Sequence, residues 1–121
     1  MPRFEPWDVI KIPLPDGSGP PVEHRPALVI AAGRRDAEHE LVWALMITSA
    51  ANAPWPGDVP ISDLRGAGLP APSIVRCAKI ATFESGRAQK IGVLTRPAER
   101  AAIARHLALA VAPATGRQSN N

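Results

Sequence analysis

Proline and glycine cut this chain into short pieces, and their placement limits the possible folds more than any other feature of the sequence. They concentrate in three segments, at 15–21, 54–57 and 66–72. Both residues favour turns, so each segment predicts an irregular loop. The rest of the chain must fold as short elements between these loops.

The stretches between the loops have the apolar patterns of β-strands. Residues 8–14 place apolar side chains on alternate positions, which is typical of a half-buried strand. Residues 27–32 and 41–48 are apolar almost throughout and predict strands buried on both faces, with Trp43 in the core. The full set of predicted strands is 8–14, 27–32, 41–48, 58–61, 73–83 and 89–94, with a charged turn at 33–40.

The pattern becomes helical after Thr95. Thr95 suits an N-cap, and Pro97 and Glu99 suit a first turn. The apolar face of this helix comprises Ile103, Leu107 and Ala110. Several short strands closed by one helix predict a mainly β fold, a small antiparallel β-barrel with a C-terminal helix packed on it. We expect one domain at 1–112 and a flexible polar tail at 113–121.

The composition fits a folded protein in a reducing compartment. Of the 121 residues, 45% are hydrophobic and 21% charged, which is typical of a globular chain and not of a disordered one. No apolar run approaches the roughly 18 residues that span a bilayer, and no signal-peptide pattern opens the chain. We therefore expect a cytoplasmic protein that does not associate with membranes. The single cysteine, Cys77, excludes an intrachain disulfide and is expected to be buried.

The net charge is mildly positive, at +3, and the types of basic residue are more informative than the net charge. Eleven of the fourteen basic residues are arginine, the side chain best suited to bidentate contact with phosphate. A GC-rich genome, which favours arginine codons, would give the same bias. Composition alone leaves both explanations open.

Neither a metal site nor a cofactor site is predicted. The three histidines share no ligand spacing, and one cysteine cannot complete a zinc site. The DGSG sequence at 16–19 lacks the lysine and the following helix of a phosphate-binding loop. No Gly-x-Ser-x-Gly sequence marks a nucleophilic serine.

Polar residues stand at the ends of two apolar strands. Arg25 comes two residues before one of them, and Pro26 forces it into an extended conformation. A charged side chain there needs a carboxylate, such as Glu23 or Asp58, or an anionic ligand. The other strand ends on Thr48 and Ser49, whose hydroxyls either cap a turn or meet a ligand.

Four short motifs follow one another along the chain: RPALVI at 25–30, ITS at 47–49, SIVRCAKIAT at 73–82 and IGVL at 91–94. In this order and spacing they resemble the MazF/PemK family, the toxins of type II toxin–antitoxin systems. The resemblance runs from about Trp7 to Val111. It implies an SH3-like β-barrel with helices, usually a homodimer. Known members are mostly metal-independent endoribonucleases that cut single-stranded RNA, often mRNA, and a cognate antitoxin silences them.

The resemblance also implies roles for individual residues. The catalytic arginine of the family falls on Arg25, and its catalytic hydroxyl falls on Thr48. Its RNA-contacting positions fall on Ser49, Arg76 and Ser18, and Lys79 and Trp55 are further RNA-binding candidates in this sequence. Trp55 suits stacking on an unpaired base, although a cover for the barrel end and a dimer contact are equally open.

The implied chemistry needs no metal. RNA is cut when its own 2′-hydroxyl attacks the adjacent phosphate, and the protein must then stabilise a dianionic phosphorane and move two protons. Arg25 offers a planar pair of donors and Thr48 a further one. Glu23 and His24 are candidates for proton transfer because they neighbour Arg25.

Two positions depart from the family pattern. Trp7 and Asp8 stand where members commonly have Gly-Asp, and Ala78 stands where many have an aspartate implicated in catalysis. Ala78 cannot act as an acid or a base. This keeps open a non-catalytic SH3-like barrel toxin that acts by binding, either an inactive relative that binds RNA or antitoxin or a gyrase poison. The polar C-terminal sequence argues against the gyrase mode, which depends on an apolar, aromatic end.

Overall fold

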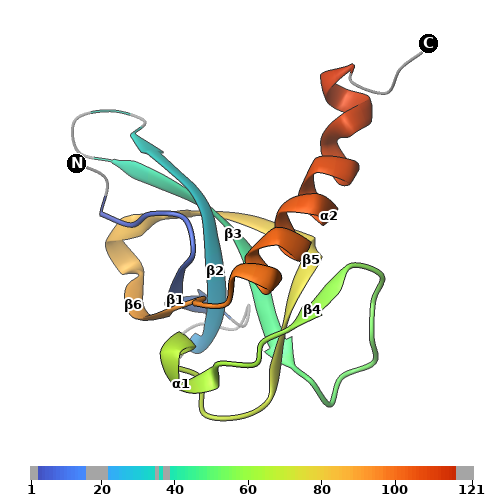
Figure 1. Ribbon diagram of the computed structural model, residues 1–121. Helices are drawn as coiled ribbons and strands as arrows, with labels where there is room; N and C mark the ends of the chain where they lie inside the picture. The colour runs from blue at the N-terminus through green and yellow to red at the C-terminus, as the bar shows by residue number, and fades with distance from the viewer. Residues whose placement is uncertain (1–2, 16–21, 35, 37–38, 117–121) are drawn as a thin grey trace.

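The computed structural model describes residues 3–15, 22–34, 36 and 39–116, which form one antiparallel sheet and a long C-terminal helix (Figure 1). The strands are β1 (Asp8–Pro15), β2 (Val22–Arg34), β3 (Glu40–Ser49), β4 (Asp58–Pro60), β5 (Ser73–Glu84) and β6 (Gln89–Val93). The helices are α1 (Leu64–Ala67), the 3-10 turn η1 (Ser85–Arg87) and α2 (Pro97–Thr115). The six strands lie in the order β4-β5-β3-β2-β1-β6. The predicted fold class, mainly β with a C-terminal helix, is confirmed.

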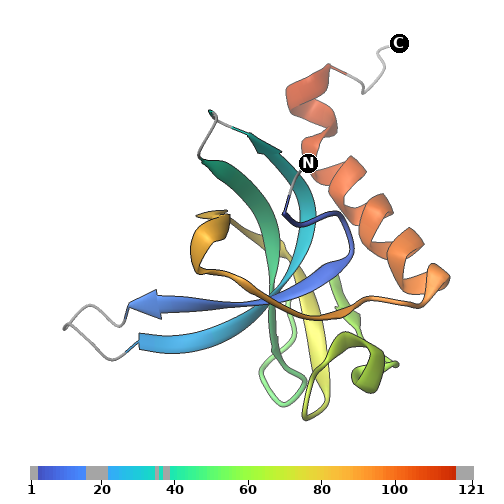
Figure 2. The ribbon, with the colours of Figure 1, turned by 90° about the vertical axis from the view of Figure 1, so that its left-hand side faces the viewer.

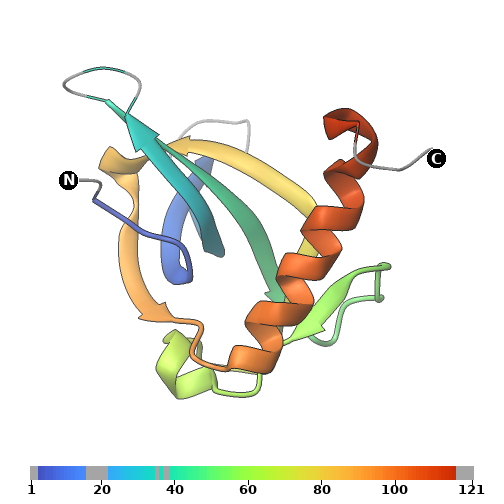
Figure 3. The same ribbon diagram turned by 45° about the horizontal axis from the view of Figure 1, so that its top comes forward.

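The sheet is strongly curled, and α2 lies against one side of it. Figure 2 shows the ends of β1 and β2 projecting away from the body on the side opposite α2. Figure 3 shows α2 running past β5 and β4, and the helix contacts both strands. None of the described helices has the length and apolar content needed to cross a membrane.

The apolar runs of β2 and β3 exist because both faces of these strands are buried. On one face Leu28 and Leu45 pack in a cluster that includes Ile103 of α2. On the other face Val29 and Ala44 join a second cluster. Successive side chains of a strand point to opposite faces, so a strand between two cores must be apolar at every position.

Trp43 is an exception to this pattern, and its predicted place in the core is wrong. Its exposed fraction is 56%. It lies on the same face of β3 as Leu45, but closer to the turn that connects β2 to β3. Its cross-strand partners there are Ala31 and Thr82, which are too small to cover an indole ring.

Three predicted boundaries also shift. β2 begins at Val22, five residues before the predicted strand at 27–32, because its hydrogen bonding to β1 continues through a polar stretch. α1 begins at Leu64 and takes in Gly66 and Ala67, the first two residues of the predicted loop 66–72; the Asp63 side chain caps it by accepting a hydrogen bond from the Gly66 N–H. Arg96, not Thr95, is the N-cap of α2, since the Thr95 hydroxyl donates to Asp63 instead.

The far end of α2 lies beyond the predicted domain boundary. The helix continues through Pro113 to Thr115 and ends at Gly116, which adopts a left-handed conformation at φ 71°. It thus extends three residues into the segment 113–121 that the sequence assigned to a polar tail. Residues 117–121 lie outside the described part of the chain.

Candidate active site

Arg25 and Thr48 come together because β2 and β3 are antiparallel neighbours. The register pairs Ala27 of β2 with Met46 of β3. Arg25 stands two residues before Ala27, and Thr48 two residues after Met46, so both lie at the same end of the same strand pair. The beginning of one strand and the end of the other deliver a cation and a hydroxyl to one edge of the sheet.

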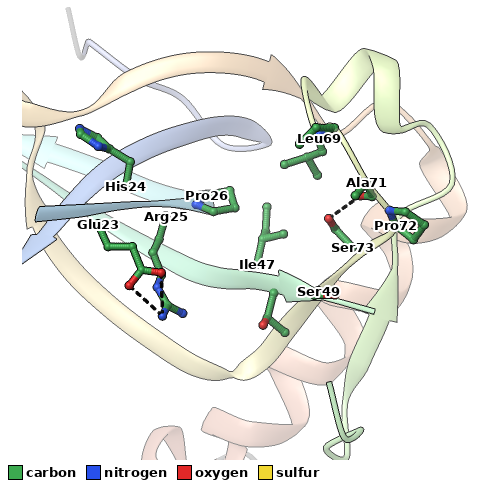
Figure 4. Close-up of a pocket in the computed structure, with 12 residues that line it drawn as sticks. Glu23, His24, Arg25, Pro26, Ile47, Ser49, Leu69, Ala71, Pro72 and Ser73 are labelled. Carbon is green, nitrogen blue, oxygen red and sulfur yellow. Dashed lines mark hydrogen bonds and ion pairs between the residues drawn. The ribbon is translucent and has the colours of Figure 1, made fainter. Parts of the chain in front are cut away.

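An open pocket of about 310 Å³ lies at this edge. Its second wall is the segment that leads from α1 into β5 (Figure 4). The lining residues are Glu23, His24, Arg25, Pro26, Ile47, Thr48, Ser49, Leu69, Pro70, Ala71, Pro72 and Ser73. The pocket therefore combines a polar rim from β2 and β3 with an apolar wall from residues 69–72.

Arg25 makes an ion pair that remains open to solvent. Its Nη2 lies 3.2 Å from Oε1 and 3.4 Å from Oε2 of Glu23. The Arg25 side chain is 42% exposed and that of Glu23 63%. Exposed pairs of this kind contribute about 0–1 kcal/mol, so an anionic ligand can replace the carboxylate at little cost.

The two hydroxyls at the end of β3 have different partners. Ser49 Oγ accepts a hydrogen bond from the Ala51 N–H at 3.1 Å, so it caps the turn that leaves the strand. Thr48 Oγ1 accepts one from Asn52 Nδ2 at 2.6 Å. Asn52 was not among the residues predicted for the site, although a polar side chain four residues after Thr48 in a connecting loop was the available signal.

Arg76 occupies a different environment from Arg25. It is 8% exposed and holds Asp58 bidentately, with Nε 3.2 Å from Oδ1 and Nη2 3.0 Å from Oδ2. Its Nη2 also donates to the Ala53 carbonyl at 2.8 Å, and its guanidinium lies 4.2 Å from the centre of the Trp55 ring. Asp58, which the sequence offered as a partner for Arg25, pairs with Arg76 instead. Arg76 and Trp55 do not line the pocket.

The carboxylate of Asp58 is held in its charged form. Burial alone would raise its pKa. The hydrogen bonds from Arg76 and from the Trp55 N–H, together with the arginine charge, outweigh burial and leave the pKa below its ordinary value. Arg76 and Asp58 thus form a nearly enclosed ion pair between β4 and β5.

The remaining predicted residues that the structure describes lie apart from the pocket. Lys79 is exposed on β5, in the irregular stretch of that strand between the pairs Met46–Arg76 and Leu45–Ile80. Ala78 lies in the same stretch. Cys77 is buried, as predicted, and burial together with the Asp58 charge raises the pKa of its thiol. Ser18 lies outside the described residues.

In chemical terms, the pocket offers an exposed guanidinium, a hydroxyl and a carboxylate beside an apolar wall. The first two bind anions, the third takes up protons, and the wall suits flat apolar groups such as bases. Figure 4 shows Glu23 and Arg25 directed toward the same side of β2 and His24 directed away from them.

Comparison with known proteins gives two findings. A family model described as PemK-like, MazF-like toxin of type II toxin-antitoxin system matches residues 5–111. Among solved structures, the chain is similar to the Mycobacterium tuberculosis toxin MazF-mt6, with a TM-score of 0.60 and 24% identity over 88% of this chain and 95% of that one. This second likeness concerns the fold. A search of curated proteins finds no match.

Proposed function

This chain belongs to the PemK-like, MazF-like toxins of type II toxin–antitoxin systems, and from this premise we propose that it is an endoribonuclease that cuts single-stranded RNA without a metal ion. The observation that carries the proposal is the shared pocket of Arg25 and Thr48. Arg25 is partly exposed there, and its only ion-pair partner among the described residues is the exposed Glu23.

The proposed reaction begins with the 2′-hydroxyl of the RNA. Glu23 takes its proton, the 2′ oxygen bonds to the adjacent phosphorus, and the bond from phosphorus to the 5′ oxygen breaks. The leaving oxygen takes a proton from water. The products are a 2′,3′-cyclic phosphate and a 5′-hydroxyl. We assign the proton transfer to Glu23 in preference to His24, because Glu23 lies beside Arg25 and His24 is directed away.

Arg25 and Thr48 stabilise the charge that develops on the phosphorane. The guanidinium places two parallel N–H donors on the non-bridging oxygens, and the threonine hydroxyl adds a third. Each lost donor costs about 3 kcal/mol of transition-state stabilisation, or roughly 100-fold in rate. The apolar wall at 69–72 lies next to these groups and contacts the neighbouring base.

The proposal includes the partners of the toxin. Its substrate is single-stranded RNA, with mRNA as the target, and it acts in the cytoplasm. A cognate antitoxin covers the cationic pocket with an acidic segment. The active form is a homodimer, and Trp43, Ile80, Leu109 and Val111 are the exposed apolar side chains that a second copy would cover. Trp43→Ser should then shift the mass of the protein in solution toward the monomer, and an unchanged dimer would exclude Trp43 from the interface.

The central test is cleavage of a long RNA transcript in the presence of EDTA. The wild-type protein should give discrete fragments that end in 2′,3′-cyclic phosphate. Thr48→Val should reduce the cleavage rate by about 100-fold, and Arg25→Ala, which removes two donors, by about 10,000-fold. Arg105→Ala, which removes an exposed arginine from α2 and changes the net charge equally, should leave the rate unchanged. If folded wild-type protein leaves the RNA intact, it is not a nuclease.

Ala78 favours one alternative, a toxin that binds RNA or antitoxin without cutting. It replaces a carboxylate that many relatives use, and it lies on β5, outside the pocket. The same assay separates the two functions. RNA that is retained by the protein and recovered at full length would support binding alone.

A further inference from the structure

We propose that Asn52 is a positioning residue that turns the Thr48 hydroxyl into a hydrogen-bond donor for the RNA phosphate. The inference rests on the proposed function, since Thr48 is the group that meets the phosphate. It concerns a side chain that lines no part of the pocket and acts through its neighbour.

The direction of one hydrogen bond carries the argument. A threonine hydroxyl has one proton and two lone pairs, so it can donate once. Asn52 Nδ2 donates to Thr48 Oγ1 at 2.6 Å. In the described part of the chain this oxygen takes part in hydrogen bonds only as an acceptor. The amide proton occupies one lone pair, so the hydroxyl proton points away from Asn52 and stays available for a ligand.

A phosphate requires this orientation. Its non-bridging oxygens only accept hydrogen bonds, so the hydroxyl is useful only while its proton faces them. A freely rotating hydroxyl would spend part of its time presenting a lone pair to the phosphate, which is repulsive. A donor on its other side also polarises the O–H bond and strengthens the bond that it donates.

The loop that carries Asn52 is fixed on both sides. Before it, the Asn52 N–H donates to the Ser49 carbonyl at 3.1 Å. After it, the Ala53 carbonyl accepts from Arg76 at 2.8 Å, and Trp55 stacks on the same guanidinium. The buried Arg76 therefore anchors the loop from inside the protein, and Asn52 is held at the height of Thr48.

Two substitutions test the polarity. Asn52→Ala frees the hydroxyl rotor and should lower kcat for transcript cleavage by about 5- to 10-fold, the usual worth of one hydrogen bond, with little change in KM. Asn52→Asp has the same shape but only accepts. Its carboxylate should accept a hydrogen bond from the Thr48 hydroxyl, repel the phosphate and lower cleavage by about 100-fold or more. Gln89→Ala removes an exposed amide from β6 and serves as the control with unchanged kcat.

The Thr48→Val background separates positioning from a general structural effect. If Asn52 acts through the Thr48 hydroxyl, Asn52→Ala should cause no further loss once that hydroxyl is gone. The same fold-loss in both backgrounds would overturn the inference, as would an Asn52→Asp variant that cleaves like Asn52→Ala or like the wild type.

A second measurement keeps the test valid if the wild-type protein does not cleave RNA at all. Inorganic phosphate is titrated into the protein and followed by two-dimensional NMR. Phosphate affinity should fall from wild type to Asn52→Ala to Asn52→Asp, and Asn52→Ala should have no effect beside Thr48→Val. That result with uncut RNA would reject the proposed nuclease and support the role of Asn52. If the Asn52 variants bind phosphate with the same affinity as the wild type, or if no phosphate binds, that role is overturned.

Discussion

Removing the buried guanidinium of Arg76 should destabilise the protein far more than removing any other arginine side chain that the structure describes. Arg76→Ala removes the cation beside the Asp58 carboxylate, whose side chain is only 11% exposed in the wild-type structure. It also leaves the Ala53 carbonyl without its donor and Trp55 without the cation that it covers. Breaking one partner of such a pair costs about 3–5 kcal/mol. That is a large fraction of the roughly 5–15 kcal/mol that stabilises an ordinary domain.

Urea unfolding followed by tryptophan fluorescence measures this loss. With a slope of about 2 kcal/mol per molar urea, the midpoint should fall by about 2 M. Arg105→Ala, on the exposed face of α2, should stay within about 0.5 kcal/mol of wild type. Asp58→Asn combined with Arg76→Ala should cost less than the sum of the two single changes, because each single change leaves a charge or a donor unpaired.

The pH dependence of the unfolding free energy tests the same ion pair independently. The pKa of Asp58 lies below its ordinary 3.8 in the folded protein. A depressed pKa stabilises the folded state above the unfolded value, and that stabilisation is lost as the pH falls through the folded value. The difference in unfolding free energy between wild type and Arg76→Ala should therefore be largest above about pH 4 and should become smaller below it. A gap under about 1 kcal/mol at neutral pH, accompanied by loss of RNA binding, would show that Arg76 contacts RNA and does not anchor the loop.

Three further outcomes follow from the structure. Arg25→Lys keeps the charge but loses the planar fork, so RNA cleavage should fall by about 10-fold or more while the urea midpoint stays unchanged; equal cleavage would exclude bidentate contact. Gly68→Ala should cost more than about 2 kcal/mol, because Gly68 has a φ of 73° and a Cβ would lie 2.0 Å from the Ile91 carbonyl oxygen. Thermal melts measure this loss. Gly86→Ala is the matched control, because a Cβ on Gly86 would have no atom within 4 Å. The thiol of Cys77 should react with a thiol reagent only slowly until the protein unfolds, since burial raises its pKa; rapid reaction in the folded state would contradict that environment.

The spacing of apolar residues located the sheet, because the apolar positions of a strand depend on which of its faces are buried. The continuous apolar runs at 27–32 and 41–48 coincide with the parts of β2 and β3 that have a core on both faces. Periodicity failed where hydrogen bonding continues without burial. The first residues of β2, including Glu23 and Arg25, are strand by their pairing with β1 and carry no apolar signal. α1 was hidden for a related reason: a four-residue helix has no period, and its cap is a single aspartate, Asp63.

The candidate site was predictable in part for a topological reason. Once 27–32 and 41–48 are taken as an antiparallel pair, the residues before the first strand and after the second must lie at the same end of the sheet. Asn52 and the partner of Arg76 were not predictable in this way, because both depend on where the connection between β3 and β4 folds back. Asp58 lies directly opposite Arg76 in the register of β4 and β5, and nothing in the sequence states that register.

The two arginines show how burial divides roles between residues of the same type. Separating Arg76 from Asp58 would leave charges in a nearly enclosed site, so no ligand can compete for that guanidinium at a reasonable cost. Separating Arg25 from Glu23 costs about 1 kcal/mol at most, because water screens both groups, and a phosphate with two acceptor oxygens more than compensates. The enclosed arginine is therefore fitted to hold a loop in place, and the open one is fitted to meet a substrate. Thr48 stands at the point where β3 leaves the core. It lines the pocket together with Arg25 and accepts a hydrogen bond from Asn52, in the loop whose Ala53 carbonyl accepts from Arg76. This is a physical reason for an apolar core strand to end in hydroxyls: rigid strands fix the position of the last residues, and the polar groups at that end need only a fixed direction to become part of a site.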